Sequence, residues 1–146
     1  PIVQIGVDAQ THELQTAWLE RLVLRGGVGR FSIDQLANFA DVQLNKLKDK
    51  SYSPDWVKVL TSDDEQQAKL IATRLQEAFM PLTQLVDKVE DISLGAALNA
   101  SVLVLEALAS DEAGNHSALY ADDAGTMLRN ALTQFFNRND FFKVGI

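Results

Sequence analysis

One strongly apolar stretch, residues 92–109, constrains the fold of this chain more than any other feature of its sequence. Its length and its many alanines favour a helix over a strand. A helix that is apolar almost all the way round belongs in the middle of a bundle. We therefore expect this helix to be central and buried, with helices near residues 32–48, 64–90 and 118–137 packed around it.

A membrane span is the alternative interpretation of the same stretch. Glu106 lies within it, and Asp91 and Asp111 flank it. A charge near the centre of a bilayer costs about 2.5–3.5 kcal/mol. We therefore expect a buried core helix and no contact with a membrane.

The rest of the chain shows the spacing of amphipathic helices. Apolar residues recur at three- and four-residue intervals from about Thr11 to the glycines at 26–27, and again over 32–48 and 64–90. Pro81 falls inside the longest segment, where it either kinks one helix or separates two. A short β-prone run precedes Thr11, and we expect it to form an extended arm rather than an edge strand.

Two local patterns make finer predictions. Ser32 followed by Gln35 has the spacing of a capping box, so we expect Ser32 to cap the second helix. In the first helix, the periodicity selects an inward-facing set: Leu14, Ala17, Trp18 and Leu22.

Length and organisation favour one domain. The chain has 146 residues, a common size for a single domain, and no repeat or long linker divides it. We predict an all-α, single-domain bundle of five to seven helices over residues 1–146. In this prediction the helix at about 92–109 is central, residues 1–10 form a short extended arm, and residues 135–146 form a Phe-rich tail.

Charge and cysteine content exclude several kinds of partner and site. Twenty acidic residues against 13 basic residues give a formal net charge of −7. This charge repels nucleic-acid phosphates, so we expect no nucleic-acid partner, and it suits a basic protein partner. The chain has no cysteine, which removes disulfides, thiolate zinc sites and cysteine nucleophiles and suits a reducing cytoplasm. The first ten residues lack the pattern of a secretory signal, so we expect a cytoplasmic location.

No residue pattern predicts catalysis, a cofactor or a metal. His12 and His116 are the only histidines, and neither has the spacing of a metal-ligand pair, so we interpret them as unrelated surface residues. The acidic pairs fall near predicted helix starts, where carboxylates cap backbone amides. We therefore expect a non-enzymatic protein without a cofactor or a bound metal. Only carboxylates converging from different helices would change this expectation.

Two polar residues of the apolar helix are candidates for a buried polar site. A buried Glu106 carboxylate needs protonation or a basic partner, unless it lies near enough to the helix end to reach water. Asn99 either fixes the packing through a buried hydrogen bond or lines a small cavity. Three arginines are available as partners for Glu106: Arg21, Arg74 and Arg129.

Four phenylalanines near the C-terminus are the strongest candidates for a partner-binding surface. They are Phe135, Phe136, Phe141 and Phe142, with Arg138 between them. One helix face cannot turn all four towards the same core, so we expect some to anchor a partner protein or a second copy of the chain. The alternative is a tail that folds back over its own bundle.

These features together predict a non-enzymatic protein–protein interaction module, such as an adaptor, a regulator or a toxin-neutralising protein. A first alternative is a self-assembling coat or scaffold subunit, a homo-oligomer joined through the N-terminal arm and the aromatic tail. A second alternative is a small-molecule-binding helical protein or enzyme with a pocket near Asn99 and Glu106.

Overall fold

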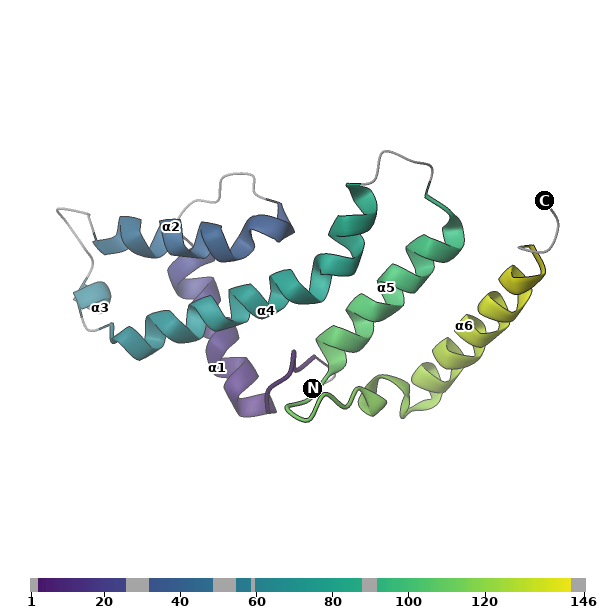
Figure 1. Ribbon diagram of the computed structural model, residues 1–146. Helices are drawn as coiled ribbons and strands as arrows, with labels where there is room; N and C mark the ends of the chain where they lie inside the picture. Colours follow the sequence, from purple (N-terminus) through teal and green to yellow (C-terminus); the bar gives the residue numbers. More distant parts are fainter. Residues whose placement is uncertain (1–2, 26–31, 49–54, 59, 88–91, 143–146) are drawn as a thin grey trace.

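The computed structural model describes residues 3–25, 32–48, 55–58, 60–87 and 92–142, without the side chains of residues 56, 58 and 139–142. Within these ranges the chain forms helices and turns and no strand, so the all-α prediction is confirmed (Figure 1). The elements in chain order are α1 (Ala9–Leu19), the π-helical turn η1 (Glu20–Leu24), the 3-10 turn η2 (Ile33–Gln35), α2 (Leu36–Lys48), α3 (Asp55–Lys58), α4 (Ser62–Val86), α5 (Leu94–Ala109), the 3-10 turn η3 (Ser117–Tyr120) and α6 (Asp123–Phe142).

Helix α4 is the element against which most others pack (Figure 1). It contacts α1, α2 and α5. Ala68 and Ala72 of α4 are both 0% exposed, and their small side chains allow the helices that cross α4 to approach closely. One buried cluster joins α1, η1, α2 and α4 with the N-terminal segment: Ile5, Leu19, Leu22, Val23, Leu36, Ala40, Leu44, Ala68, Ile71 and Ala72.

The prediction that the apolar helix at 92–109 is central and buried was wrong. Helix α5 buries Ala100 and Val104, packs on α4, and is partly covered by η3. Other large side chains of α5 are open to water, since Leu103 is 46% and Leu105 41% exposed. Too few elements surround α5 to cover all its faces, so a helix that is apolar on nearly every side stays partly exposed between α4 and α6 (Figure 1).

The inward-facing set predicted for the first helix is confirmed only in part, because Leu22 is buried and Trp18 packs against the core, whereas Ala17 is exposed. Leu14 is 50% exposed, whereas its neighbour Gln15 is only 2% exposed. A π-helical turn at Glu20–Leu24 follows α1. The buried residues, Gln15, Leu19, Leu22 and Val23, keep the spacing of one helical face, which runs one position beyond Leu14 and Trp18.

Gln15 forms a buried polar contact between α1 and α4. Its side-chain nitrogen donates to Oε1 of Gln67 at 2.7 Å, and its side-chain oxygen accepts from Nη1 of Arg74 at 3.0 Å. Both ends of the amide are therefore hydrogen-bonded, which is what a polar group needs when it is withdrawn from water.

The described part of the N-terminal segment is not the extended arm that the sequence predicted. The N–H groups of Gln4 and Ile5 donate to the Leu108 carbonyl at 3.0 and 3.1 Å, and the N–H of Gly6 donates to the Ser110 carbonyl at 2.7 Å. Positive φ angles of 51° at Ile5 and 72° at Gly6 turn the chain there. Because the last carbonyls of a helix lack helical partners, the segment completes the end of α5 in its own chain.

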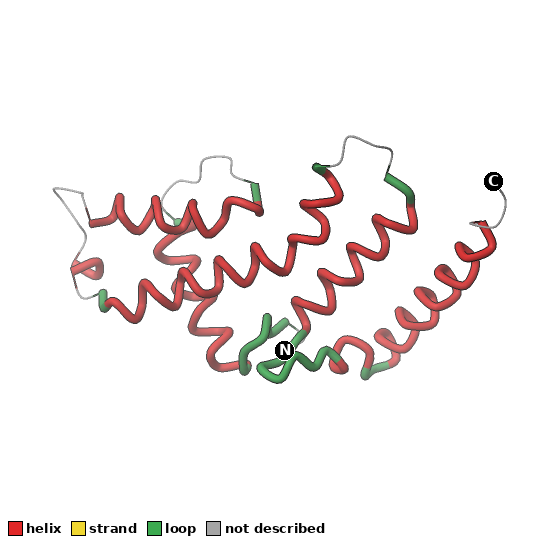
Figure 2. The backbone as a smooth tube through the Cα atoms, viewed as in Figure 1, coloured by secondary structure: helices red, strands yellow, loops and turns green. Residues whose placement is uncertain are grey.

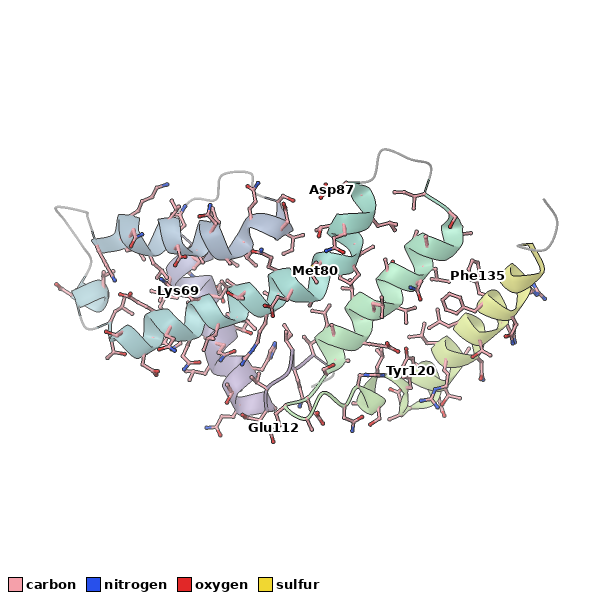
Figure 3. The ribbon with its side chains drawn as sticks, viewed as in Figure 1. Lys69, Met80, Asp87, Glu112, Tyr120 and Phe135 are labelled. Atoms are coloured by element: carbon pink, nitrogen blue, oxygen red, sulfur yellow. The ribbon has the colours of Figure 1, made fainter. Side chains whose placement is uncertain are left out.

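Pro81 lies inside α4, which continues as one helix from Ser62 to Val86. The single-helix alternative is therefore confirmed. The helix changes direction near Met80 (Figure 3), as expected where a proline removes a backbone donor and clashes with the preceding turn.

The elements divide into two regions along the molecule. Helices α1, α2 and α4 interlock at one end, whereas α5, η3 and α6 follow one another at the other end (Figure 2). Of the helices described, none has the length and apolar content that crossing a membrane requires.

Candidate functional site

An open cavity of about 390 Å³ lies between α5, η3 and α6, and we call it the α5–α6 groove. One end of the groove is polar and is formed mainly by η3, and the other end is apolar and is formed by the two helices. The lining residues are Val102 of α5, Asn115, His116, Ser117 and Tyr120 around η3, and Arg129, Leu132, Thr133 and Phe136 of α6.

A tight turn after α5 brings the polar residues back to that helix. Asp111 Oδ1 accepts from the N–H groups of Ala113 and Asn115 at 2.9 and 2.8 Å, and Gly114 adopts a left-handed φ of 77°. Asn115 Oδ1 accepts in turn from the N–H of Ser117 at 3.0 Å, where η3 begins. The chain thereby reverses, and η3 lies against α5.

Gly125 allows η3 to lie directly on the start of α6. A Cβ atom at this position would stand 2.5 Å from the Leu119 carbonyl oxygen and 2.7 Å from Cα of Tyr120. The N–H of Gly125 donates to Asp122 Oδ1 at 2.6 Å. Because the opposing atoms belong to the backbone, this close junction requires glycine, and it holds Tyr120 beside α6.

The Glu106 carboxylate of α5 contacts two residues that line the polar end. The Tyr120 hydroxyl donates to Glu106 Oε1 at 2.9 Å, and Nε2 of His116 lies 3.6 Å from the same oxygen (Figure 3 labels Tyr120). Partial burial raises the pKa of the Tyr120 phenol, and the hydrogen bond to Glu106 makes a second, smaller contribution in the same direction. The Glu106 side chain is 27% exposed, so it is partly buried and has partners from the turn that follows α5.

Arg129 of α6 lies over the Tyr120 ring, with its guanidinium carbon 4.9 Å from the ring centroid. This distance is typical of a cation–π contact. Among the described residues no carboxylate forms an ion pair with Arg129. The other two arginines proposed for Glu106 lie elsewhere, since Arg21 is placed over Trp18 and Arg74 binds Gln15.

The apolar end of the groove is formed by Val102, Leu132 and Phe136. The rings of Phe135 and Phe136 meet edge to face, with 5.9 Å between centroids and 85° between planes. Phe135 lies on the side of α6 that faces α5 (Figure 3). In the described part of α6, no large apolar side chain is fully buried. The groove is thus an apolar surface that the chain itself covers only in part.

The structure brings together part of the aromatic set predicted from the sequence. Phe136 lines the groove, and the Phe135 ring contacts the Phe136 ring. Arg138 is exposed and does not line the groove. The side chains of Phe141 and Phe142 lie outside the described residues.

The two polar candidates of the apolar helix have different surroundings. Glu106 does not line the groove itself but contacts Tyr120 and His116, which do. Asn99 is exposed, so the burial predicted for it was wrong. Sequence reasoning missed His116 and Tyr120, because only the turn signal at residues 111–115 indicates that the chain returns to α5.

Comparisons with protein-family models, with curated proteins and with solved structures find no match for this chain. Among the described residues, no group of three or more histidines and carboxylates is arranged to hold a metal ion. Function is therefore inferred from the geometry of the α5–α6 groove and from the charge of the chain.

Proposed function

We propose that this chain is a non-enzymatic protein-binding module, an adaptor, regulator or toxin-neutralising protein, that holds an amphipathic helix of a partner protein in the α5–α6 groove. The observation that carries the proposal is the state of α6. This helix spans 20 residues, yet none of its large apolar side chains is fully buried in the part whose side chains the structure describes. A partner that covers them would remove apolar surface that the monomer leaves in contact with solvent.

The groove has the features of a helix-binding surface. It lies between two helices and exposes aromatic side chains, which contribute more than other residues to binding energies at interfaces. Leu132, Phe135 and Phe136 of α6 are partly buried, and covering what remains of one such side chain contributes less than about 1 kcal/mol. Together they provide a central anchor.

The partner and the location follow from the charge and the composition of the chain. A formal net charge of −7 favours a partner that is basic overall and disfavours nucleic acid. A cytoplasmic location belongs to the proposal, because the chain uses no cysteine.

The test is affinity purification from the source cells with quantitative mass spectrometry. Leu132→Asp and Phe136→Asp place a charge in the groove, whereas Gln134→Asp makes a similar change at an exposed position of the same helix. We expect the unmodified chain and Gln134→Asp to retain the same protein, and the two groove variants to lose it. Circular dichroism checks that all variants keep their helices. Retention of the same proteins by all four chains would contradict the proposal.

Self-assembly is the second candidate, because the same uncovered surface of α6 would suit a second copy of the chain. The support from the N-terminus is weaker than the sequence suggested, since Gln4, Ile5 and Gly6 bind α5 of their own chain. Light scattering over a range of concentrations separates the candidates. A monomer at every concentration favours a different protein as the partner. The small-molecule alternative has less support, because Asn99 does not line the groove.

A further inference from the structure

We propose that the partner segment carries a carboxylate at the η3 end of the α5–α6 groove, where it binds the guanidinium of Arg129. This inference rests on the proposed function and names the chemistry by which the groove selects its partner. It follows from the position of the Arg129 guanidinium and from the hydrogen bonds that the carboxylates around η3 already accept.

The first observation is that Arg129 has no acidic partner among the residues that the structure describes. The positions three and four residues away on α6, where a helical ion pair would form, are occupied by Gly125, Thr126, Leu132 and Thr133. The fold thus makes no evident use of the hydrogen-bond donors of this guanidinium.

The second observation is that the guanidinium is held in place. Arg129 lies over the Tyr120 ring at 4.9 Å, and the Tyr120 hydroxyl is fixed by its hydrogen bond to Glu106. The cation–π contact limits the freedom of the Arg129 side chain, so less of that freedom is lost when a carboxylate binds the guanidinium.

The third observation is that the nearest carboxylates are already engaged. Glu106 accepts from Tyr120 and lies 3.6 Å from His116. Asp111 and Asp122 each accept backbone N–H groups in the turns around η3. These contacts hold the three carboxylates in place without neutralising them, so a carboxylate of the partner binds there through its direct contacts with Arg129.

The order of residues along α6 gives the recognition a direction. Arg129 is followed at three- and four-residue intervals by Leu132, Thr133 and Phe136, all of which line the groove. If a partner helix lies along this row, one of its residues reaches Arg129. Its residues one and two turns further along then reach the apolar end of the groove. We therefore expect an acidic group about one helical turn from the nearest apolar anchor.

The test is a selection from a display library of random peptides about 16 residues long, between four and five helical turns. The targets are the full chain, Arg129→Gln, Phe136→Asp and the control Arg138→Gln, which removes the same charge from an exposed position outside the groove. We expect the full chain and Arg138→Gln to enrich peptides with an apolar helical spacing and an acidic residue one turn away. With Arg129→Gln, the apolar spacing should persist and the acidic preference should disappear.

A binding measurement on one selected peptide then gives the size of the effect. Replacing its acidic residue by the matching amide should weaken binding to the full chain by about tenfold to a hundredfold. The same replacement should have little effect on binding to Arg129→Gln. A peptide with an amidated C-terminus distinguishes a side-chain carboxylate from a terminal one.

Three results would overturn the inference, and they distinguish its failure from that of the proposed function. If peptides bind through Phe136 with no acidic preference, or if Arg129→Gln keeps the acidic preference, the carboxylate is not read by Arg129 and the proposed function stands. If no selected peptide is lost with Phe136→Asp, the groove is not a protein-binding surface and the proposed function fails as well.

Discussion

Helices α2 and α6 carry comparable apolar stripes, but only α2 has its stripe covered. On α2, Leu36, Ala40 and Leu44 are all at most 3% exposed, because α4 and η1 lie against that face. On α6, Leu132 and Phe136 remain partly open, and η3 is the main element that packs against the helix. The difference teaches that an amphipathic pattern identifies which face of a helix is apolar. The pattern does not say which element of the chain covers that face, or whether any element does.

The largest expected effect compares leucines from the two regions. Leu22→Ala removes a side chain that is 2% exposed, so it should lower the free energy of unfolding by about 2–5 kcal/mol. Leu132→Ala removes a partly buried side chain and should cost about 1 kcal/mol. Urea unfolding of both variants measures the difference. Equal losses would mean that the apolar face of α6 is as well covered as the core, and they would contradict the difference between α2 and α6.

The next effect compares two polar contacts. Gln15→Ala leaves Gln67 and Arg74 without their common buried partner, and we expect a loss of about 1–3 kcal/mol in the free energy of unfolding. Tyr120→Phe removes one hydrogen bond at the partly exposed end of the groove and should cost about 0.5–1.5 kcal/mol. The same urea measurement ranks them. A larger loss for Tyr120→Phe would contradict this ranking, because it would mean that the Tyr120–Glu106 hydrogen bond stabilises the fold more than the buried contacts of Gln15.

The smallest effect is a change in the titration of Tyr120. Burial and the hydrogen bond to Glu106 raise the pKa of its phenol, so the neutral form stabilises the fold below the pKa of the unfolded chain. That contribution is lost as the pH rises through the higher pKa of the folded state. The chain has two tyrosines, and Tyr52→Phe isolates Tyr120 for titration by phenolate absorbance.

Glu106→Gln provides the matched control for this titration. It removes the negative charge that opposes ionisation, so the pKa of Tyr120 should move back towards its ordinary value. An unchanged pKa in Glu106→Gln would show that the Tyr120–Glu106 contact is not formed in solution.

The periodicity of the sequence was sufficient to predict the helices, and local contacts explain where finer predictions were wrong. Leu14 was predicted to face inward, but the buried face of α1 runs through Gln15 and Leu19. Apolar periodicity does not detect a glutamine that is buried because α4 supplies its hydrogen-bond partners. Ser32 makes no side-chain cap, whereas Thr61 and Asp64 form the capping box that begins α4. Serine and threonine both commonly cap helices, so residue type alone does not distinguish Ser32 from Thr61.

The candidate site could be predicted only in part. Glu106 was found because a charge interrupts an apolar helix, and Phe136 because aromatic residues are concentrated near the C-terminus. Arg129 was considered only as an ion-pair partner of Glu106, and it lies over the Tyr120 ring instead. That placement depends on the close contact at Gly125, which a sequence pattern does not express.

Hydrogen exchange on the isolated chain tests the central claim most directly, namely that α6 has an apolar face which its own chain does not cover. Amides of α2 and α4 should exchange only when the whole core opens, because both helices contribute to the buried cluster. Amides of α6 should exchange at least about tenfold faster, through local opening. Equal protection of α6 and α4 would contradict the account, because it would mean that the α6 surface is already covered.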